Sequence, residues 1–191
     1  MSSPYNLTLF GAQQEVWDAM MGDKNCVLVL PIGSGKSFLS SWILPIAAST
    51  PNMHKGRDIL YVAPTSPMVN RIIWKDLKER CMRMWGLEDE KHINNSTKTI
   101  TFPNGIRIFC LSAETGLKGI NASLIIADEA AEFNQEALQE LSNRTRPIPG
   151  QPNSQGRMIF ISTPEGKNAF FDLYEYALGN PREWCVIHKT W

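Results

Sequence analysis

The residues with the clearest chemistry in this sequence are 31–37, which read Pro-Ile-Gly-Ser-Gly-Lys-Ser. An apolar run at 26–30 precedes them, and a helix-like pattern begins at Phe38. A glycine-rich loop between a strand and a helix can point its backbone N–H groups at phosphate. In such a loop a lysine reaches the β and γ phosphates, and the next hydroxyl holds Mg²⁺. The segment therefore predicts an ATP-binding loop made of Pro31, Ile32, Gly33, Ser34, Gly35, Lys36 and Ser37.

The match to the usual G-x-x-x-x-G-K-[ST] pattern is partial, because Leu30 stands where the first glycine belongs. A second motif adds weight. The apolar run 124–127 ends in Asp128 and Glu129, as in a buried strand that presents two carboxylates at its end. We expect Asp128 to hold the nucleotide's Mg²⁺ through water and Glu129 to polarise the attacking water. The alternative is a strand that ends in a solvated acidic turn.

The composition is that of an ordinary globular protein of one domain, with 191 residues and 43% hydrophobic residues. Its 19 basic and 19 acidic residues balance, so contact with nucleic acid must come from local patches. Four dispersed cysteines, Cys26, Cys81, Cys110 and Cys185, indicate reduced thiols and not disulfides or metal ligands. No apolar run reaches the roughly 20 residues that span a bilayer, and no signal segment is recognisable, so we expect an intracellular protein without a membrane segment.

Helical and strand patterns alternate along the chain. We expect the second helix to kink or end early at Pro45, and a hairpin around 102–105. The alternation predicts an α/β fold with a mostly parallel central sheet flanked by helices, and ligands at the carboxyl ends of the strands. The expected helices are 13–21, 38–48, 66–85, 135–142 and 170–178, and the expected strands are 26–30, 59–63, 99–101, 106–110, 124–127, 158–161 and 184–187.

Two further groups of residues could contact the nucleotide. Ser162 and Thr163 close a strand next to Pro164, where hydroxyls can sense the γ phosphate. The same residues are also a common way to end a strand. Near the N-terminus, the amide of Gln13 could hydrogen-bond the adenine edge while Phe10 stacks beside it. Gln14 competes with Gln13 for this role.

Taken in order, these motifs resemble the large terminase subunits, the ATP-driven DNA-packaging motors of tailed phages. The resemblance covers nearly the whole chain, although no single motif is decisive. It rests on the adenine motif at 10–13, the Walker A loop at 33–37, Tyr-Val-Ala-Pro-Thr at 61–65, Leu-Lys-Gly at 117–119, the Asp-Glu-Ala-Ala form of Walker B within 125–131, and Ser-Thr-Pro at 162–164.

This resemblance implies a P-loop NTPase fold of the ASCE type. It also implies that residues 1–191 form the ATPase domain of a large terminase, with a C-terminal nuclease of ribonuclease H type absent from this chain. The implied activity is Mg²⁺-dependent ATP hydrolysis that moves double-stranded viral DNA into a procapsid. The implied partners are DNA, the portal protein, the small terminase subunit and further copies in a ring, expected to be a pentamer, in the cytoplasm of the infected bacterial host.

One departure from the family concerns charge at the γ phosphate. Walker A loops of the family often carry an arginine where this chain has Ile32. The resemblance makes Lys118, in the Leu-Lys-Gly loop, the candidate finger that acts on a neighbouring subunit, with catalytic roles also for Lys36 and Glu129. Arg144 and Arg146 are rival fingers, and Lys118 could equally be a solvated surface residue.

Two other functions stay open. One is a helicase-like translocase on other nucleic acid, which would share most of these residues. The other is a non-hydrolysing module in which nucleotide only holds subunits together. The incomplete Walker A pattern and Ile32 favour this module, whereas Glu129 argues against it.

Overall fold

The computed structural model describes residues 8–50, 57–115, 117, 119–145 and 156–190. Its strands are β1 (Asn25–Val29), β2 (Asp58–Ala63), β3 (Ile93–Asn94), β4 (Thr99–Thr101), β5 (Arg107–Ser112), β6 (Ala122–Asp128), β7 (Arg157–Ser162) and β8 (Trp184–His188). The helices are α1 (Ala12–Met21), α2 (Lys36–Ser49), α3 (Ser66–Val69), α4 (Lys75–Trp85), α5 (Gln135–Arg144) and α6 (Ala169–Gly179), with short turns η1 (Asn70–Trp74), η2 (Ala113–Thr115) and η3 (Ala130–Glu132).

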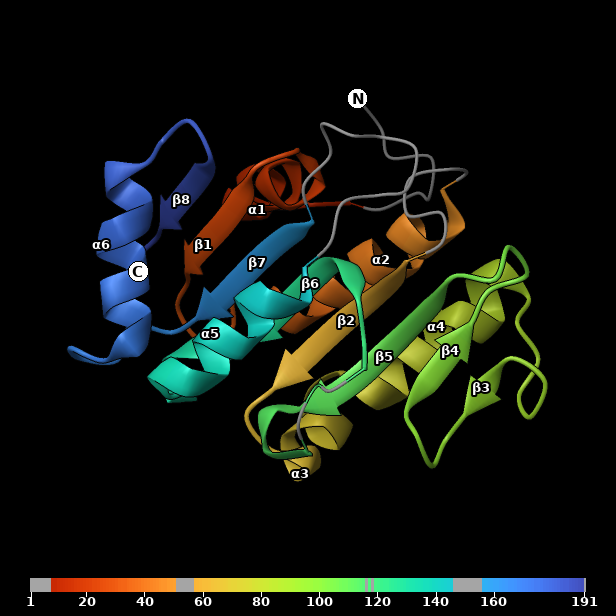
Figure 1. Cartoon of the computed structure of the whole chain (residues 1–191). Helices are drawn as coiled ribbons and strands as arrows, with labels where there is room; N and C mark the ends of the chain where they lie inside the picture. The colour runs from red at the N-terminus through yellow and green to blue at the C-terminus, as the bar shows by residue number, and fades with distance from the viewer. Residues whose placement is uncertain (1–7, 51–56, 116, 118, 146–155, 191) are drawn as a thin grey trace.

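The strands of the described part form one sheet in the order β3-β4-β5-β2-β6-β7-β1-β8 (Figure 1). Every pair from β5 to β8 is parallel, and only β3 and β4 add antiparallel pairs at one edge. The predicted hairpin is β4 with β5. The predicted α/β class with a mostly parallel central sheet is therefore confirmed.

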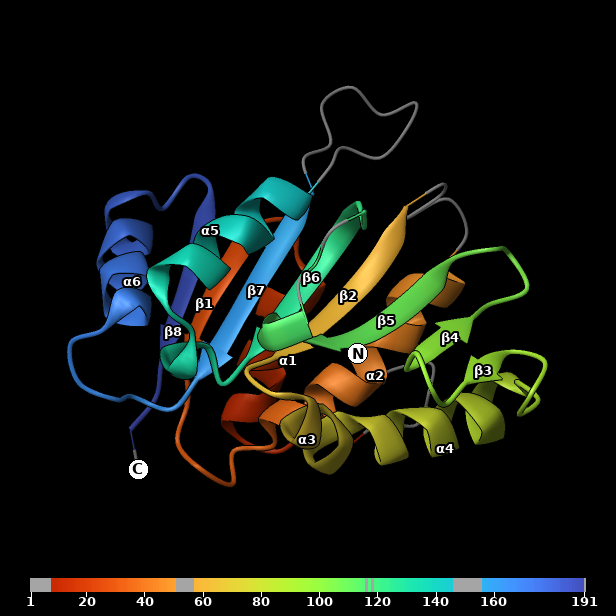
Figure 2. The same ribbon diagram turned by 60° about the horizontal axis from the view of Figure 1, so that its bottom comes forward.

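Helices cover both faces of the sheet. Helices α1, α2 and α4 lie against one face, and α5 and α6 lie against the other (Figure 2). The buried side chains fall into two matching clusters, one on each face, because successive residues of a strand point to opposite sides. Strands covered on both faces must be apolar throughout, which explains the uninterrupted runs in β1 and β6 that the sequence showed.

Helix α2 differs from its expected extent. Of the expected kink or early end at Pro45, the early end is wrong, because the helix continues to Ser49 with the proline inside it. Most of its positions from Lys36 to Ala48 are buried, so contacts on all sides hold the helix together. Tertiary packing here outweighs the intrinsic cost of the missing N–H donor.

The helix expected over 66–85 is interrupted. Thr65 caps its first turn by accepting a hydrogen bond from the backbone N–H of Met68 at 3.4 Å. A π-helical turn, η1, then separates α3 from α4. Such a turn adds a residue to the helical repeat, and the periodicity of apolar residues alone does not reveal it.

The sheet order brings the motif-bearing strands together. Strand β7 lies between β1 and β6, with Val29 beside Ser162 and Asp128 beside Ile161. The carboxyl ends of these parallel strands therefore meet at one edge of the sheet, as the arrowheads in Figure 1 show. Residues far apart in the sequence, from the glycine-rich loop to the segment at 162–164, converge there.

Two other expectations concern cysteine and membranes. All four cysteines are free thiols, and Cys26, Cys81 and Cys110 are buried. Among the described helices, none combines the length and hydropathy needed to cross a bilayer.

Candidate nucleotide-binding site

The glycine-rich loop connects β1 to α2. The backbone N–H of Leu30 donates to the carbonyl of Ser162 at 2.9 Å, which ties the start of the loop to β7. Gly33 and Gly35 have φ angles of 80° and 88°, in the left-handed region that favours glycine. A Cβ on Gly35 would lie 2.7 Å from Nε2 of Gln13, so a side chain at this position would displace the Gln13 amide from the loop. The first N–H groups of α2 have no intrahelical acceptor and face the loop, which suits an anion.

Gln13 lies against this loop. Its Nε2 donates to the carbonyl of Ser34 at 3.3 Å, and its Oε1 accepts the backbone N–H of Phe10 at 3.1 Å. Gln14 instead donates to Asp18 at 2.8 Å, along its own helix. The structure thus places Gln13, and not Gln14, at the loop. The ring of Phe10 is 71% exposed beside it.

Asp128 is completely buried at the end of β6. Its Oδ2 accepts a hydrogen bond from the hydroxyl of Tyr61 at 2.8 Å, and its Oδ1 accepts the backbone N–H of Glu129 at 3.0 Å. Burial raises the pKa of the Asp128 carboxyl to about 6, although both hydrogen bonds and the charge of Lys36 oppose the rise. Burial, together with the nearby Asp128 carboxylate, also raises the pKa of Tyr61 well above its usual value.

Glu129 has an unusual backbone for a residue with a side chain, with φ 53° and ψ 45°. This left-handed conformation costs about 1–2 kcal/mol outside glycine. It accompanies a contact with the loop, in which Oε1 of Glu129 lies 3.6 Å from Nζ of Lys36. The lysine expected to bind phosphate is only 8% exposed and pairs with the carboxylate expected to activate water. Ser37 follows Lys36 in the first turn of α2 and is half-buried.

The two hydroxyls at the end of β7 have different surroundings. Ser162 is buried, and its Oγ accepts the backbone N–H of Ala131 at 3.1 Å. Its hydroxyl is therefore bound to the segment that follows Glu129. Thr163 is half-buried and lines a cavity of about 430 Å³ beside the loop. The other residues that line this cavity are Pro31, Ile32, Glu129, Glu132, Pro164 and Glu165.

Asn168 bonds the segment that follows Glu129, and the sequence patterns did not predict this contact. Its Nδ2 donates to the carbonyl of Ala131 at 3.0 Å and to that of Glu165 at 2.9 Å. Its Oδ1 caps α6 by accepting the backbone N–H of Phe171 at 3.0 Å. Ala131 is thus held on its N–H by Ser162 and on its carbonyl by Asn168. An asparagine before a helical run is a visible capping signal, but the bond to Ala131 depends on the tertiary fold.

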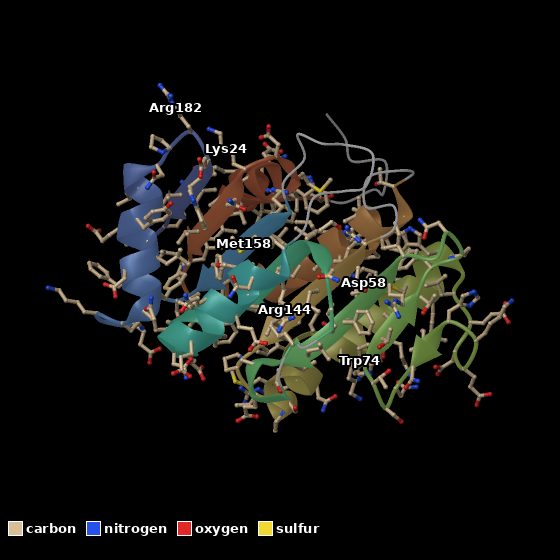
Figure 3. The ribbon with its side chains drawn as sticks, in the orientation of Figure 1. Lys24, Asp58, Trp74, Arg144, Met158 and Arg182 are labelled. Carbon is tan, nitrogen blue, oxygen red and sulfur yellow. The ribbon has the colours of Figure 1, made fainter. Side chains whose placement is uncertain are left out.

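Of the three candidate finger residues, the structure describes only Arg144. Lys118 and Arg146 lie outside the residues that the structure describes. Arg144 stands at the end of α5 (Figure 3), where its Nη2 lies 3.0 Å from Oε1 of Glu140 on the same helix. Of the three candidates, the described one already has a carboxylate partner in its own chain.

The donors present suit Mg²⁺ bound together with a nucleotide. In the described part of the chain, no group of three or more His, Cys, Asp and Glu residues could hold a metal ion alone. Mg²⁺ typically binds one or two protein oxygens together with substrate phosphates and water. The buried carboxylate of Asp128 at the end of β6 and the hydroxyl of Ser37 in the first turn of α2 provide oxygen ligands of this kind.

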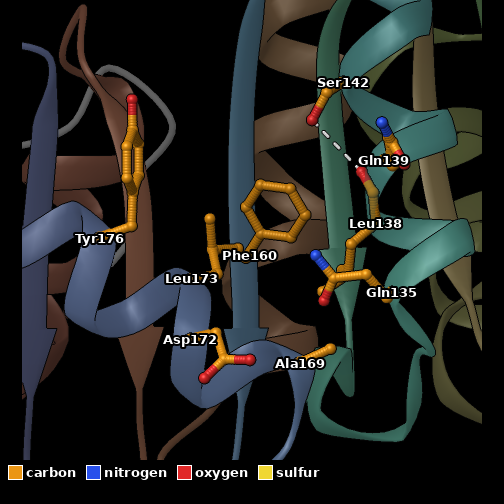
Figure 4. A pocket seen from close by; sticks show the side chains of 9 residues that line it. All are labelled: Gln135, Leu138, Gln139, Ser142, Phe160, Ala169, Asp172, Leu173 and Tyr176. Atoms are coloured by element: carbon orange, nitrogen blue, oxygen red, sulfur yellow. Dashed lines mark hydrogen bonds between the residues drawn. The ribbon is translucent and has the colours of Figure 1, made fainter.

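A second cavity, of about 410 Å³, lies between α5 and α6 over β7 (Figure 4). Its apolar side chains include Leu138, Phe160 and Leu173, with Asp172 and Tyr176 at its side. Its lining among the described residues contains no basic side chain and no glycine-rich loop. Among the described residues, the loop between β1 and α2 is therefore the better candidate for phosphate binding.

Comparisons with known proteins identify the family and the fold. The family model described as DEAD/DEAH box helicase matches residues 10–169. The chain is 31% identical over 160 residues to the large subunit of terminase from Escherichia phage T5, across 82% of this chain and 34% of that protein. It thus spans about a third of the length of this relative.

Solved structures show the same fold. The HK97 bacteriophage large terminase has a TM-score of 0.76 at 20% identity, covering 95% of this chain and 39% of that one. The large terminase ATPase domain of Thermus phage P74-26 has a TM-score of 0.66 at 18% identity, covering 96% of this chain and 82% of that one. The resemblance to large terminases that the sequence motifs indicated is confirmed by these comparisons, and so is the P-loop fold.

Proposed function

The chain belongs to the DEAD/DEAH box helicase family of P-loop ATPase folds, and from this premise we propose that it is the ATPase domain of a phage DNA-packaging motor. The relatives reported above are large terminases. The observation that carries the proposal is the convergence of Lys36, Asp128 and Glu129 at one edge of the sheet. In this proposal residues 1–191 are the ATPase domain, and a nuclease domain belongs to the longer protein.

Each residue of the edge has a role in the proposed reaction. The N–H groups of the loop and Lys36 bind the phosphates, while Gln13 contacts the base. Ser37 and Asp128 hold Mg²⁺, which when bound neutralises charge on the phosphates. Once a phosphate group pairs with Lys36 in place of Glu129, the carboxylate of Glu129 is free to orient and polarise a water molecule. Thr163 lines the cavity beside the loop, and the hydroxyl of Ser162 accepts the backbone N–H of Ala131. These two contacts support a relay from the γ phosphate to the segment after β7.

The proposed partners are those that the resemblance to large terminases implies. We place the chain in a ring, proposed to be a pentamer, that acts with portal protein and small terminase subunit on double-stranded DNA in the host cytoplasm. Lys118 is the proposed finger that reaches the nucleotide of a neighbouring copy. The alternatives are a helicase-like translocase, which the family model favours, and a module that binds nucleotide without hydrolysing it.

Substitution of Glu129 by glutamine tests the proposed chemistry. Glu129→Gln keeps the shape of the side chain but removes the base, so we expect ATP binding to persist while turnover falls by about 10²–10⁴-fold. Phosphate release and binding of a fluorescent ATP analogue measure the two properties separately. Glu132→Gln is a matched control, because Glu132 lines the same cavity and is exposed.

The outcomes separate the candidate functions. Wild-type turnover in Glu129→Gln would refute the assignment of the base. Tight ATP binding without turnover in the wild-type chain, even when all partners are present, would favour the assembly module.

A further inference from the structure

Tyr61 is a buried aromatic residue at the centre of the sheet, and its hydroxyl contacts the candidate metal site. It lies on β2 and is completely buried, with its ring in the core cluster that faces α2. Its neighbour on β6 is Ile126. Because side chains alternate along a strand, Tyr61 shares a face with Ile126 and with Asp128, two residues further on. Its hydroxyl donates to Oδ2 of Asp128 at 2.8 Å.

The carboxylate of Asp128 is held at both oxygens. Tyr61 donates to Oδ2 from a neighbouring strand, and the N–H of Glu129 donates to Oδ1 at 3.0 Å. Two donors on different sides fix the rotation of the carboxylate plane. Each carboxylate oxygen has two acceptor positions, so one remains on each oxygen for a metal or a metal-bound water.

We propose that Tyr61 is a positioning residue that orients the Asp128 carboxylate for the divalent cation bound with the nucleotide. The inference rests on the proposed function, and it adds a residue that touches neither nucleotide nor metal. Partners that hold a metal-binding carboxylate typically contribute 10–100-fold to metal affinity. Tyr61 thereby links the affinity for the cation to β2, a strand that carries none of the residues expected to bind nucleotide.

A purely structural role makes a different prediction. If the ring only fills the core, then Tyr61→Phe, which keeps the ring and removes the hydroxyl, leaves cation binding unchanged. Loss of a buried hydrogen bond lowers stability in both cases. Thermal stability therefore does not separate the two roles, whereas cation affinity measured at fixed nucleotide occupancy does.

The experiment measures Mn²⁺ binding to the chain saturated with ADP, by electron paramagnetic resonance of free Mn²⁺. We expect the dissociation constant for Mn²⁺ to rise about tenfold in Tyr61→Phe. The affinity for a fluorescent ADP analogue in EDTA should change less than about twofold, because Tyr61 is not in the phosphate loop. Tyr174→Phe is the matched control, since it removes a hydroxyl that lies 3.2 Å from Nδ1 of His188 at an exposed site.

If the dissociation constant for Mn²⁺ is unchanged in Tyr61→Phe and the wild-type chain binds ADP and Mn²⁺ normally, the inference about Tyr61 is overturned while the proposed function stands. Failure of the wild-type chain to bind ADP overturns the proposed function, and the inference with it. If Tyr61→Phe does not fold, the wild-type chain labelled with 3-fluorotyrosine provides the test. A change in the ¹⁹F chemical shift of Tyr61 when Mg²⁺ is added to the ADP-bound chain supports the inference. An unchanged chemical shift overturns it.

Discussion

Asp128 is held in the fold at an electrostatic cost. Its carboxyl is completely buried, and burial raises its pKa from 3.8 to about 6. The folded chain therefore binds a proton more tightly at this group than the unfolded chain does. Stability from this group is fully present below pH 4 and is lost as the pH rises through 6. The charged groups that face it are Lys36 and Glu129, and the hydroxyl of Tyr61 also contacts it.

Asp128→Asn should remove this pH dependence. The stability of the variant relative to wild type should improve by about 2 kcal/mol between pH 4 and pH 7, since one pKa unit corresponds to about 1.4 kcal/mol and part of the change already occurs below pH 4. Urea unfolding in EDTA, without nucleotide, measures the difference at each pH. A difference that stays constant across this range would show that Asp128 titrates normally in the folded chain.

At the residue scale, the sequence predicted the acids and the loop but not what holds them. Lys36, Asp128 and Glu129 follow apolar runs, so local patterns located them. The bond from Tyr61 to Asp128 joins residues 67 positions apart, and a tyrosine inside a strand looks like any other core residue. Asn168 was missed for the same reason, because its bond to Ala131 exists only after β6 and β7 have paired.

At the scale of elements, the segment after Glu129 connects the site to two helices. Turn η3 contains Ala131, which Ser162 and Asn168 hold from opposite sides. Helix α5 begins shortly after this turn, and Asn168 is the N-cap of α6. A change at Ala131 therefore acts on the starts of both helices that border the cavity in Figure 4.

Two asparagine caps allow this connection to be measured. Asn134 accepts the N–H of Ala137 at 2.8 Å and caps α5, so Asn134→Ala should cost about 1 kcal/mol. Asn168 caps α6 and also bonds Ala131 and Glu165. We expect Asn168→Ala to cost about 2–3 kcal/mol, because each further hydrogen bond contributes about 1 kcal/mol.

Urea unfolding of both variants gives the comparison. Equal losses for Asn134→Ala and Asn168→Ala would mean that the bonds to Ala131 and Glu165 together contribute nothing beyond the cap.

Element boundaries were predictable where local chemistry decides them and not elsewhere. Apart from the two-residue strand β3, which the sequence patterns did not predict, the strands of the described part followed from apolar runs and turn residues. The persistence of α2 through Pro45 and the π turn at η1 depend on packing around the helices, which periodicity alone does not show.

At the scale of the whole molecule, the zero net charge of the chain limits how its copies can assemble. With 19 basic and 19 acidic residues, no global field draws copies or DNA together. Subunits must then meet through local contacts, and a finger supplied by a neighbour works only in the assembled ring.

Turnover per subunit should therefore rise with protein concentration. Fingers of this kind contribute about 10³–10⁵ to rate in other nucleotide hydrolases. Steady-state phosphate release from ATP across a concentration series measures the effect. Lys118→Ala should abolish the rise, whereas Arg144→Ala should preserve it, because Arg144 already pairs with Glu140. Equal loss for Lys118→Ala at all concentrations would argue against action between subunits.

The 3.6 Å contact between Lys36 and Glu129 sets an order of events in the proposed cycle. In this proposed cycle, Glu129 pairs with Lys36 until phosphate binds, so its carboxylate does not activate water before then. When phosphate binds, Lys36 pairs with phosphate instead of Glu129, and the same step frees the Glu129 carboxylate to act on water. When the product leaves, Lys36 and Glu129 pair again. By linkage, the pair weakens ATP binding by the free energy needed to separate it, so Glu129 restrains its own substrate as well as acting on it.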